Sequence, residues 1–208
     1  MMYFSAPVSF TISAILAAVG TGLILRVPKR LLFLAMIPFF FAIQQFVEGL
    51  IWIFSMYAIH SKNIFLFFAY VFWPIWIPFS FWMAELDLWR KQFLAICLGM
   101  GIVIGLFLAM LVPSATFDFY RNSISYYSPL NSGRFDPIVF AFYGISTIAP
   151  FFISSIRKIW IIGILSILSS LGIYLVDRYI FVSTWSFFSA IISLSLFLIL
   201  EKKSFIKK

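Results

Sequence analysis

The sequence predicts an all-α membrane protein of seven transmembrane helices, with the N-terminus outside and the C-terminus in the cytoplasm. Hydrophobic residues make up 63% of the 208 residues and charged residues only 11%. Polar side chains are therefore too few to cover a soluble surface. Seven apolar stretches follow one another, each near the length of about 20 residues that crosses a bilayer. The links between them are alternately rich and poor in Lys and Arg.

The expected spans follow the apolar stretches in order. They lie near residues 5–25, 31–57, 63–84, 92–112, 136–156, 158–176 and 180–200. They form a single transmembrane domain over residues 1–200, followed by a basic cytoplasmic tail over residues 201–208. The first stretch has no basic segment before it and ends at Arg26, which favours a retained helix over a cleaved signal peptide.

The basic residues determine the expected orientation. The richer side of the chain carries Arg26, Lys29, Arg30, Arg90, Lys91, Arg157, Lys158, Lys202, Lys203, Lys207 and Lys208. The other side carries only Lys62, Arg121, Arg134 and Arg178. Because basic residues near helix ends resist translocation, the richer side is expected in the cytoplasm.

The net charge of +8 predicts membrane partners rather than nucleic acid. The basic residues sit in short links and a tail, not along one folded face. We expect them to attract anionic lipid headgroups. The sequence does not determine an oligomeric state. Cys97 is the only cysteine, so an internal disulfide is excluded.

Two polar links shape the expected ends of the bundle. The long outer link, near residues 113–136, is interpreted either as a lid over an outward-facing mouth or as a disordered connector. On the cytoplasmic side, Glu85, Asp87, Arg90 and Lys91 are expected to form a solvated loop with internal pairing.

Glu48 is the first functional candidate because an ionisable side chain inside a membrane is expensive and usually faces a bundle interior or water. Gln44 and Gln45 lie four and three residues before it, and Trp52 lies four after it. These spacings put the four side chains along one helical face. A Gln could then share hydrogen bonds with Glu48 while Trp52 caps the site.

Other polar and aromatic side chains fall at a similar expected depth. They are Ser5, Ser9, Tyr70, Trp73, Tyr143, Tyr174, Trp185 and Ser186. An outward-facing cavity with its floor near Gln44 would gather all of them. The Ser and Gly stripes of spans six and seven are also typical of close helix packing. Close packing is the preferred interpretation of those stripes.

Span three contains Pro74 and Pro78, four residues apart. Each proline removes a backbone donor, so we expect a kink or local unwinding that leaves carbonyl groups facing a cavity.

The missing residue types exclude several functions. His60 is the only histidine, which excludes bis-His haem and a three-histidine zinc site. No catalytic motif or phosphate-binding loop is present. Glu48 is the only carboxylate within a span. We therefore expect no cofactor, no metal site and, on balance, no catalysis.

Four segments resemble an uncharacterised family of small bacterial multi-pass membrane proteins. They are Phe4-Ser5-Ala6 with Ser9-Phe10, Gln44-Gln45 through Glu48-Gly49 to Trp52, Phe72-Trp73-Pro74 to Pro78, and residues 184–190. The resemblance implies a bacterial inner-membrane protein and marks Ser5, Ser9, Gln45, Glu48, Trp52, Trp73 and Trp185 as shared positions. The resemblance also implies Cys at the positions where this chain has Tyr3 and Ser186, so thiol chemistry is not expected here.

The sequence thus favours a transporter or permease for a small solute or a cation, in one version coupled to protons. Glu48 would carry the proton or cation, and Gln44 and Gln45 would orient the ligand. The expected ligand-binding residues are Glu48, Gln45, Gln44, Trp52, Trp73, Tyr174, Trp185, Ser186 and Ser9. One alternative is a receptor or partner subunit without flux. Another is a lipid-modifying enzyme with Glu48 as general base.

Overall fold

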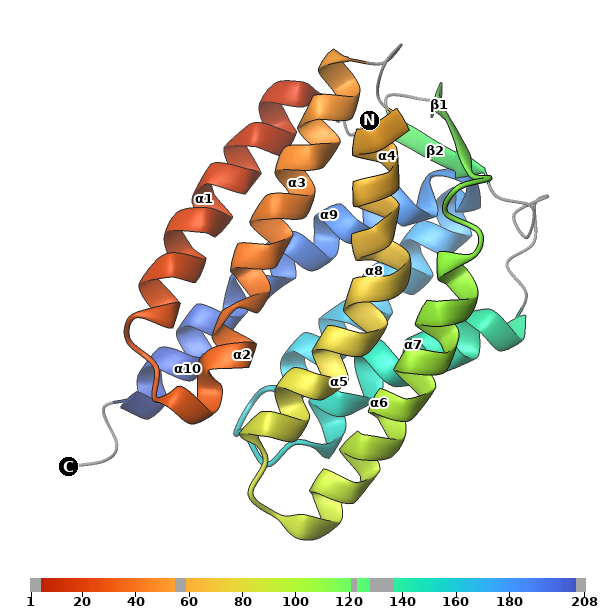
Figure 1. Ribbon diagram of the computed structural model, residues 1–208. Helices are drawn as coiled ribbons and strands as arrows, with labels where there is room; N and C mark the ends of the chain where they lie inside the picture. Colours follow the sequence, from red (N-terminus) through yellow and green to blue (C-terminus); the bar gives the residue numbers. More distant parts are fainter. Residues whose placement is uncertain (1–4, 55–58, 121–122, 128–136, 205–208) are drawn as a thin grey trace.

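The computed structural model describes residues 5–54, 59–120, 123–127 and 137–204 (Figure 1). Over these residues the chain is mostly helical. Five helical segments are long and apolar enough to cross a membrane: Ala6–Ile24, Lys29–Ile53, Ile59–Ala84, Leu88–Ala109 and Phe181–Leu200. Two shorter apolar helices cover Ile138–Ile153 and Trp160–Val176. These segments indicate a membrane location and correspond, in order, to the seven predicted stretches.

The regular elements have the following bounds. The first four segments contain α1 (Ala6–Ile24), η1 (Lys29–Leu31), α2 (Leu32–Ala35), α3 (Ile37–Ile53), α4 (Ile59–Leu66), η3 (Phe67–Phe72), α5 (Trp73–Ala84) and α6 (Leu88–Ala109). A hairpin of β1 (Thr116–Tyr120) and β2 (Ser123–Tyr127) follows. The remaining elements are α7 (Pro137–Ile153), α8 (Trp160–Val176), η5 (Arg178–Ile180), α9 (Phe181–Ser193) and α10 (Ser195–Ser204).

The helices form one bundle in which α3 packs against both α1 and α9, and α7 packs against α5, α6 and α8. The links after α1, α5 and α7 lie at one end of the bundle together with α10, while the hairpin and the start of α4 lie at the other (Figure 1). The basic residues of the richer side that the structure describes therefore lie at one end of the bundle. Arg121, Arg134, Lys207 and Lys208 lie outside the described residues.

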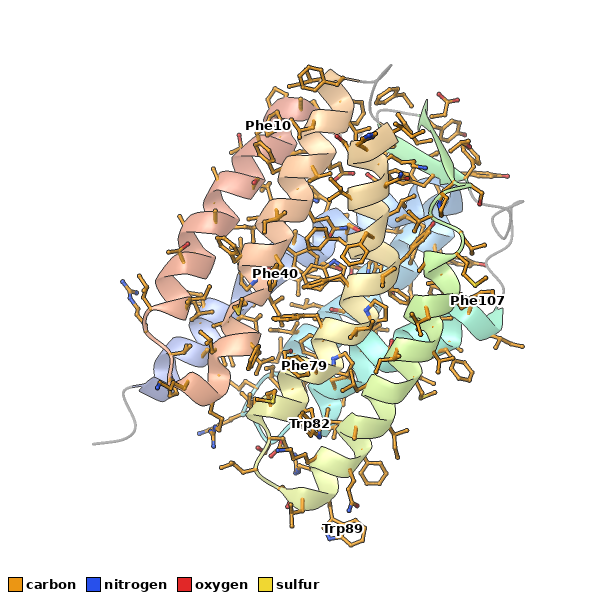
Figure 2. The ribbon with its side chains drawn as sticks, in the orientation of Figure 1. Phe10, Phe40, Phe79, Trp82, Trp89 and Phe107 are labelled. Carbon is orange, nitrogen blue, oxygen red and sulfur yellow. The ribbon has the colours of Figure 1, made fainter. Side chains whose placement is uncertain are left out.

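Aromatic side chains of α3, η3 and α5 pack against one another. The Phe40 ring lies 4.8 Å from the rings of both Phe72 and Trp76. Figure 2 shows such side chains along the whole bundle, with Phe10 near the hairpin end and Trp89 at the opposite end. The edge-to-face geometry of these pairs is favourable for aromatic rings, so it helps fix how α3 sits against α5.

The outer link contains an antiparallel hairpin that the sequence pattern did not predict. β1 pairs with β2 from Thr116 opposite Tyr127 to Tyr120 opposite Ser123. Tyr126 is buried, and its ring stacks on Phe65 of α4 at 4.9 Å. The described part of this link is therefore folded against the bundle, and its role as a lid stays a prediction. Residues 121–122 and 128–136 lie outside the description.

Lys62, predicted as an outer-loop residue, is buried on α4 with 2% of its surface exposed. Its ammonium group donates to the carbonyls of Val112 at 3.1 Å and Ala115 at 2.6 Å. Both carbonyls follow the end of α6, where unsatisfied carbonyls favour a cation. Lys62 therefore holds the start of the hairpin segment against α4.

The segment before Pro74 is a π-helix, η3. There the N–H of Trp73 donates to the carbonyl of Phe68, five residues earlier. In this pattern the Ala69 carbonyl would accept from residue 74, but proline has no N–H. The Tyr143 hydroxyl of α7 donates to the Ala69 carbonyl instead, at 2.6 Å. The local change in helical geometry agrees with the prediction for the proline, but the Ala69 carbonyl is satisfied by a neighbouring helix and is not left facing a cavity.

The expectation of a solvated loop after α5 is wrong for Glu85, which is only 3% exposed. Its carboxylate accepts from the Ser155 N–H at 2.8 Å and the Ser155 hydroxyl at 2.9 Å. It also accepts from the N–H groups of Leu86 and Asp87. Burial raises the pKa of Glu85, but these hydrogen bonds outweigh it and hold the pKa below its ordinary value. Glu85 thus fastens the α5–α6 link to the α7–α8 link.

We predict that Gly101→Ala destabilises the protein, because an added Cβ would lie 1.7 Å from the Pro74 carbonyl oxygen of α5. The expected loss in the free energy of unfolding is about 2–3 kcal/mol. Gly99→Ala on the same helix is the matched control, since nothing lies within 4 Å of its added Cβ. It should be neutral or stabilising by about 0.5–1 kcal/mol. Unfolding in detergent checks both, and equal midpoints would contradict the close approach of α5 and α6.

Glu85→Gln should lower the free energy of unfolding near neutral pH by about 1–3 kcal/mol, because the charged acceptor of four hydrogen bonds is lost. The folded pKa lies below the unfolded one, so the carboxylate stabilises above the unfolded pKa. That stabilisation disappears as the pH falls through the folded pKa. Unfolding midpoints of both proteins, measured from neutral to acidic pH, should therefore converge. A constant gap would show that the charge of Glu85 is irrelevant.

Candidate functional site

Glu48 lies on α3 with 3% of its surface exposed. Its carboxylate accepts hydrogen bonds from the Ser183 hydroxyl of α9 and from Gln45 Nε2, the latter at 3.1 Å. Gln45 precedes Glu48 by three residues, so helical geometry brings the two side chains together. The spacing prediction for Gln45 and Glu48 agrees with this contact, and the bond to Ser183 joins two helices far apart in sequence.

Gln44 forms a second polar contact between helices, one turn from Glu48. Its Oε1 accepts from Trp73 Nε1 of α5 at 2.7 Å, and its Nε2 donates to the Ser186 hydroxyl of α9 at 3.3 Å. Gln44 is completely buried. The amide therefore uses both of its ends to hold α5 and α9 against α3.

The two contacts follow from an antiparallel pairing of α3 and α9. One turn back along α3, from Glu48 to Gln44, corresponds to about one turn forward along α9, from Ser183 to Ser186. Ser189 and Ser193 continue at the same helical spacing. A row of hydroxyl groups therefore runs along α9 from the Glu48 cluster toward α10.

A partly open cavity adjoins these contacts. Its walls come from α3, α5, α7, α8, α9 and α10: Ile37, Phe41, Trp73, Ile77, Tyr143, Thr147, Ile148, Phe151, Ile162, Ser166, Trp185, Ser186, Ser189, Ile192, Ser193 and Leu196. Trp73 and Ser186 are shared with the Gln44 contact. The predicted cavity was centred on Glu48, whereas Glu48, Gln44 and Gln45 are not among the lining residues of this one.

The other predicted site residues have separate places. Trp185 lines the cavity, and its ring lies 5.7 Å from that of Tyr143. Trp52 lies near the hairpin, with its ring 4.9 Å from Phe119. Ser9 is buried on α1, and Tyr174 is 42% exposed on α8. The structure thus joins Gln44, Gln45, Glu48, Trp73 and Ser186 through hydrogen bonds and adds Trp185 through the cavity.

Ser183 is the functional-site residue that the sequence analysis missed. The periodic serines of the last span pointed to Ser186, Ser189 and Ser193, and Ser183 lies one turn before them. That spacing was the available signal. To identify Ser183 as the partner of Glu48, one must know how α9 is aligned along α3. No local sequence pattern contains that information.

Several buried polar atoms near these contacts have no hydrogen-bond partner within the described part of the chain. They include Gln45 Oε1, Trp52 Nε1, Ser125 Oγ and Trp185 Nε1. Buried polar groups are normally satisfied by protein, water or ligand, so these atoms mark positions that could receive one. In the same described ranges, no group of three or more His, Cys, Asp or Glu residues is placed to hold a metal ion.

The long apolar helices indicate a multi-pass membrane protein. The chain belongs to DUF6629, a family of unknown function, whose family model matches residues 2–208. Neither the comparison with curated proteins nor that with solved structures found a match. The predicted membership of an uncharacterised family is confirmed, while the bacterial inner membrane remains a prediction.

Gln44→Leu should destabilise the protein by about 1–3 kcal/mol, because it leaves the buried Trp73 N–H without its acceptor. Trp73→Phe removes the donor, so the double variant should lose less than the two single variants combined. Unfolding of the four proteins in detergent measures this coupling. Additive losses would mean that the Gln44–Trp73 hydrogen bond contributes nothing to stability.

Proposed function

We propose that the protein is a transporter for a small solute, in which Glu48 binds and releases a proton or a cation. The observation that carries this proposal is the burial of the Glu48 carboxylate at the α3–α9 contact. A charge inside a membrane is costly and usually serves ion or proton movement. Structural bonding between helices needs only neutral polar groups, which Gln44 and Ser186 already supply.

The partners of Glu48 suit a group that changes its charge. Ser183 and the Gln45 amide can both donate to a carboxylate, and a hydroxyl can also accept from a carboxylic acid. Protonation of Glu48 can therefore be accommodated by rotating the Ser183 hydroxyl. Gln44 and Gln45 would orient the ligand, while Trp52, Trp73 and Trp185 would form walls and contact a cationic ligand through their rings.

The positions of the hairpin and the cavity support alternating access to this site. The hairpin covers one end, where Ser123 of β2 lies 3.4 Å from Thr184, next to Ser183. The α9 serines lead from Glu48 to the cavity on the other side. A polar site between a covered end and an adjoining cavity is the arrangement expected of a transporter closed on one side.

We further infer the predicted orientation, with the hairpin end outside and the basic end in the cytoplasm of a bacterial inner membrane. The gathering of the described basic links at one end of the bundle supports it (Figure 1). At that end Lys91 Nζ lies 4.7 Å from the Trp82 ring centroid, and Arg26 lies 5.8 Å from the Phe197 ring centroid. Basic and aromatic side chains of this kind are typical of a membrane interface.

Glu48→Gln should abolish proton or cation flux in proteoliposomes while leaving the protein folded. The amide keeps the size of the side chain, and the Ser183 hydroxyl can accept from its N–H, but the amide cannot ionise. Flux is followed with a pH-sensitive or cation-sensitive dye at a membrane potential set by valinomycin. Asp118→Asn, at an exposed carboxylate on β1, is the matched control and should retain flux.

The outcomes separate transport from its alternatives. Flux in the wild type and in Asp118→Asn but not in Glu48→Gln supports Glu48 as the ion-carrying group. Equal flux in Glu48→Gln contradicts that role. An absence of flux in every protein contradicts transport of protons or of the cation tested and favours a sensor or a partner subunit. A Glu48→Gln protein that unfolds would make Glu48 a structural link between α3 and α9.

A further inference from the structure

The cavity has a different chemistry from the Glu48 cluster. Most of its wall consists of isoleucine, leucine and aromatic side chains, and none of its lining residues is charged. A charged ligand would lose its hydration here without gaining a counter-charge, so the cavity suits a neutral molecule with a largely apolar body.

Several hydrogen-bond donors of the cavity wall already donate to other groups of the protein. Tyr143 donates to the Ala69 carbonyl, Thr147 to the Tyr143 carbonyl at 2.8 Å, and Ser193 to the Ala190 carbonyl at 2.6 Å. Trp73 donates to Gln44. These groups hold the wall in shape and have no donor left for a ligand.

Two neighbouring residues of α9, Trp185 and Ser186, place donors beside one another in the cavity wall. Trp185 Nε1 is buried and has no partner in the described structure. The Ser186 oxygen accepts from Gln44, which leaves the hydroxyl proton of Ser186 to donate elsewhere. Both residues line the cavity. A buried N–H that is left unpaired is unfavourable, so an acceptor placed beside Trp185 would be stabilised.

We propose that this cavity is a binding site for a neutral, mainly apolar molecule that presents a carbonyl oxygen to Trp185 and Ser186. The aromatic wall from Phe41, Trp73 and Tyr143 suits a flat ring body. The site is distinct from Glu48. The view that the bound molecule is also the transported solute rests on the proposed function. Binding of that molecule to the cavity does not depend on the proposed function.

Benzophenone tests the site, because it is a neutral aryl ketone that forms covalent bonds to nearby C–H groups under ultraviolet light. Purified full-length protein in lipid nanodiscs is irradiated at increasing benzophenone concentrations, and the modified residues are mapped by mass spectrometry. We expect saturable labelling of lining residues such as Ile148, Ile162 and Ile192. Val103 and Leu106, which are 65% and 61% exposed on α6, should show only labelling that rises linearly with concentration.

The hydrogen-bond donor is tested with Trp185→Phe, which keeps an aromatic ring but removes the N–H. The half-saturating concentration should rise about three- to tenfold, the change expected for the loss of one hydrogen bond. Trp76→Phe is the matched control. Trp76 Nε1 is also buried without a described partner, but Trp76 is not a lining residue. Its half-saturating concentration should equal that of the wild type.

Labelling without saturation, or without enrichment on the cavity wall, would overturn the proposal. Equal saturation in Trp185→Phe and wild type would overturn the role of the carbonyl acceptor. Comparison with the flux assay separates the two proposals. Saturable labelling together with Glu48-independent flux contradicts only the transport role of Glu48, and Glu48-dependent flux without saturable labelling contradicts only the cavity ligand.

Discussion

The structure depends on one constraint: in a membrane-spanning bundle, backbone and side-chain polar groups must find partners inside the protein. The π-helix η3 shows how this works at a backbone carbonyl. Pro74 cannot supply an N–H to Ala69, and the Tyr143 hydroxyl from α7 supplies the donor. A local irregularity in one helix is therefore satisfied by a second helix, which ties the two together. The Pro74 carbonyl also loses its donor within the helix, since Pro78 lacks an N–H, and α6 approaches that carbonyl closely at Gly101.

The same constraint organises both ends of the bundle. Near the hairpin, the Lys62 ammonium satisfies the carbonyls of Val112 and Ala115, which joins α4 to the segment after α6. At the basic end, Glu85 accepts from the link after α7. In each case a buried charge is surrounded by opposite partial charges of the backbone rather than by an ion of opposite sign. For Glu85, these hydrogen bonds replace water and favour the ionised carboxylate.

The sequence predicted the helical spans well because hydropathy is a local property, and a stretch such as Ala6–Ile24 contains the whole signal. Gln45 and Glu48 could be paired for the same reason, since both belong to one helix. The partners of Glu85 and of Glu48 could not be predicted, because Ser155 lies 70 residues from Glu85 and Ser183 lies 135 residues from Glu48. The hairpin was missed because Thr116–Tyr127 is short and polar beside its apolar flanks. Its burial depends on Phe65, which sequence pattern does not connect to Tyr126.

Gln44 lies between the two proposed sites, the Glu48 cluster and the cavity. On one side, Glu48 is held by donors and can carry a charge; on the other, the cavity has an uncharged, mainly apolar wall. Gln44 bonds to Trp73 and Ser186, and both line the cavity. Its neighbour Gln45 bonds to Glu48. A ligand that accepts from Ser186 would make the oxygen of that hydroxyl a stronger acceptor for Gln44, because hydrogen bonds in a chain polarise one another. Occupancy of the cavity would therefore reinforce the α3–α9 contact in which the Glu48 carboxylate is held.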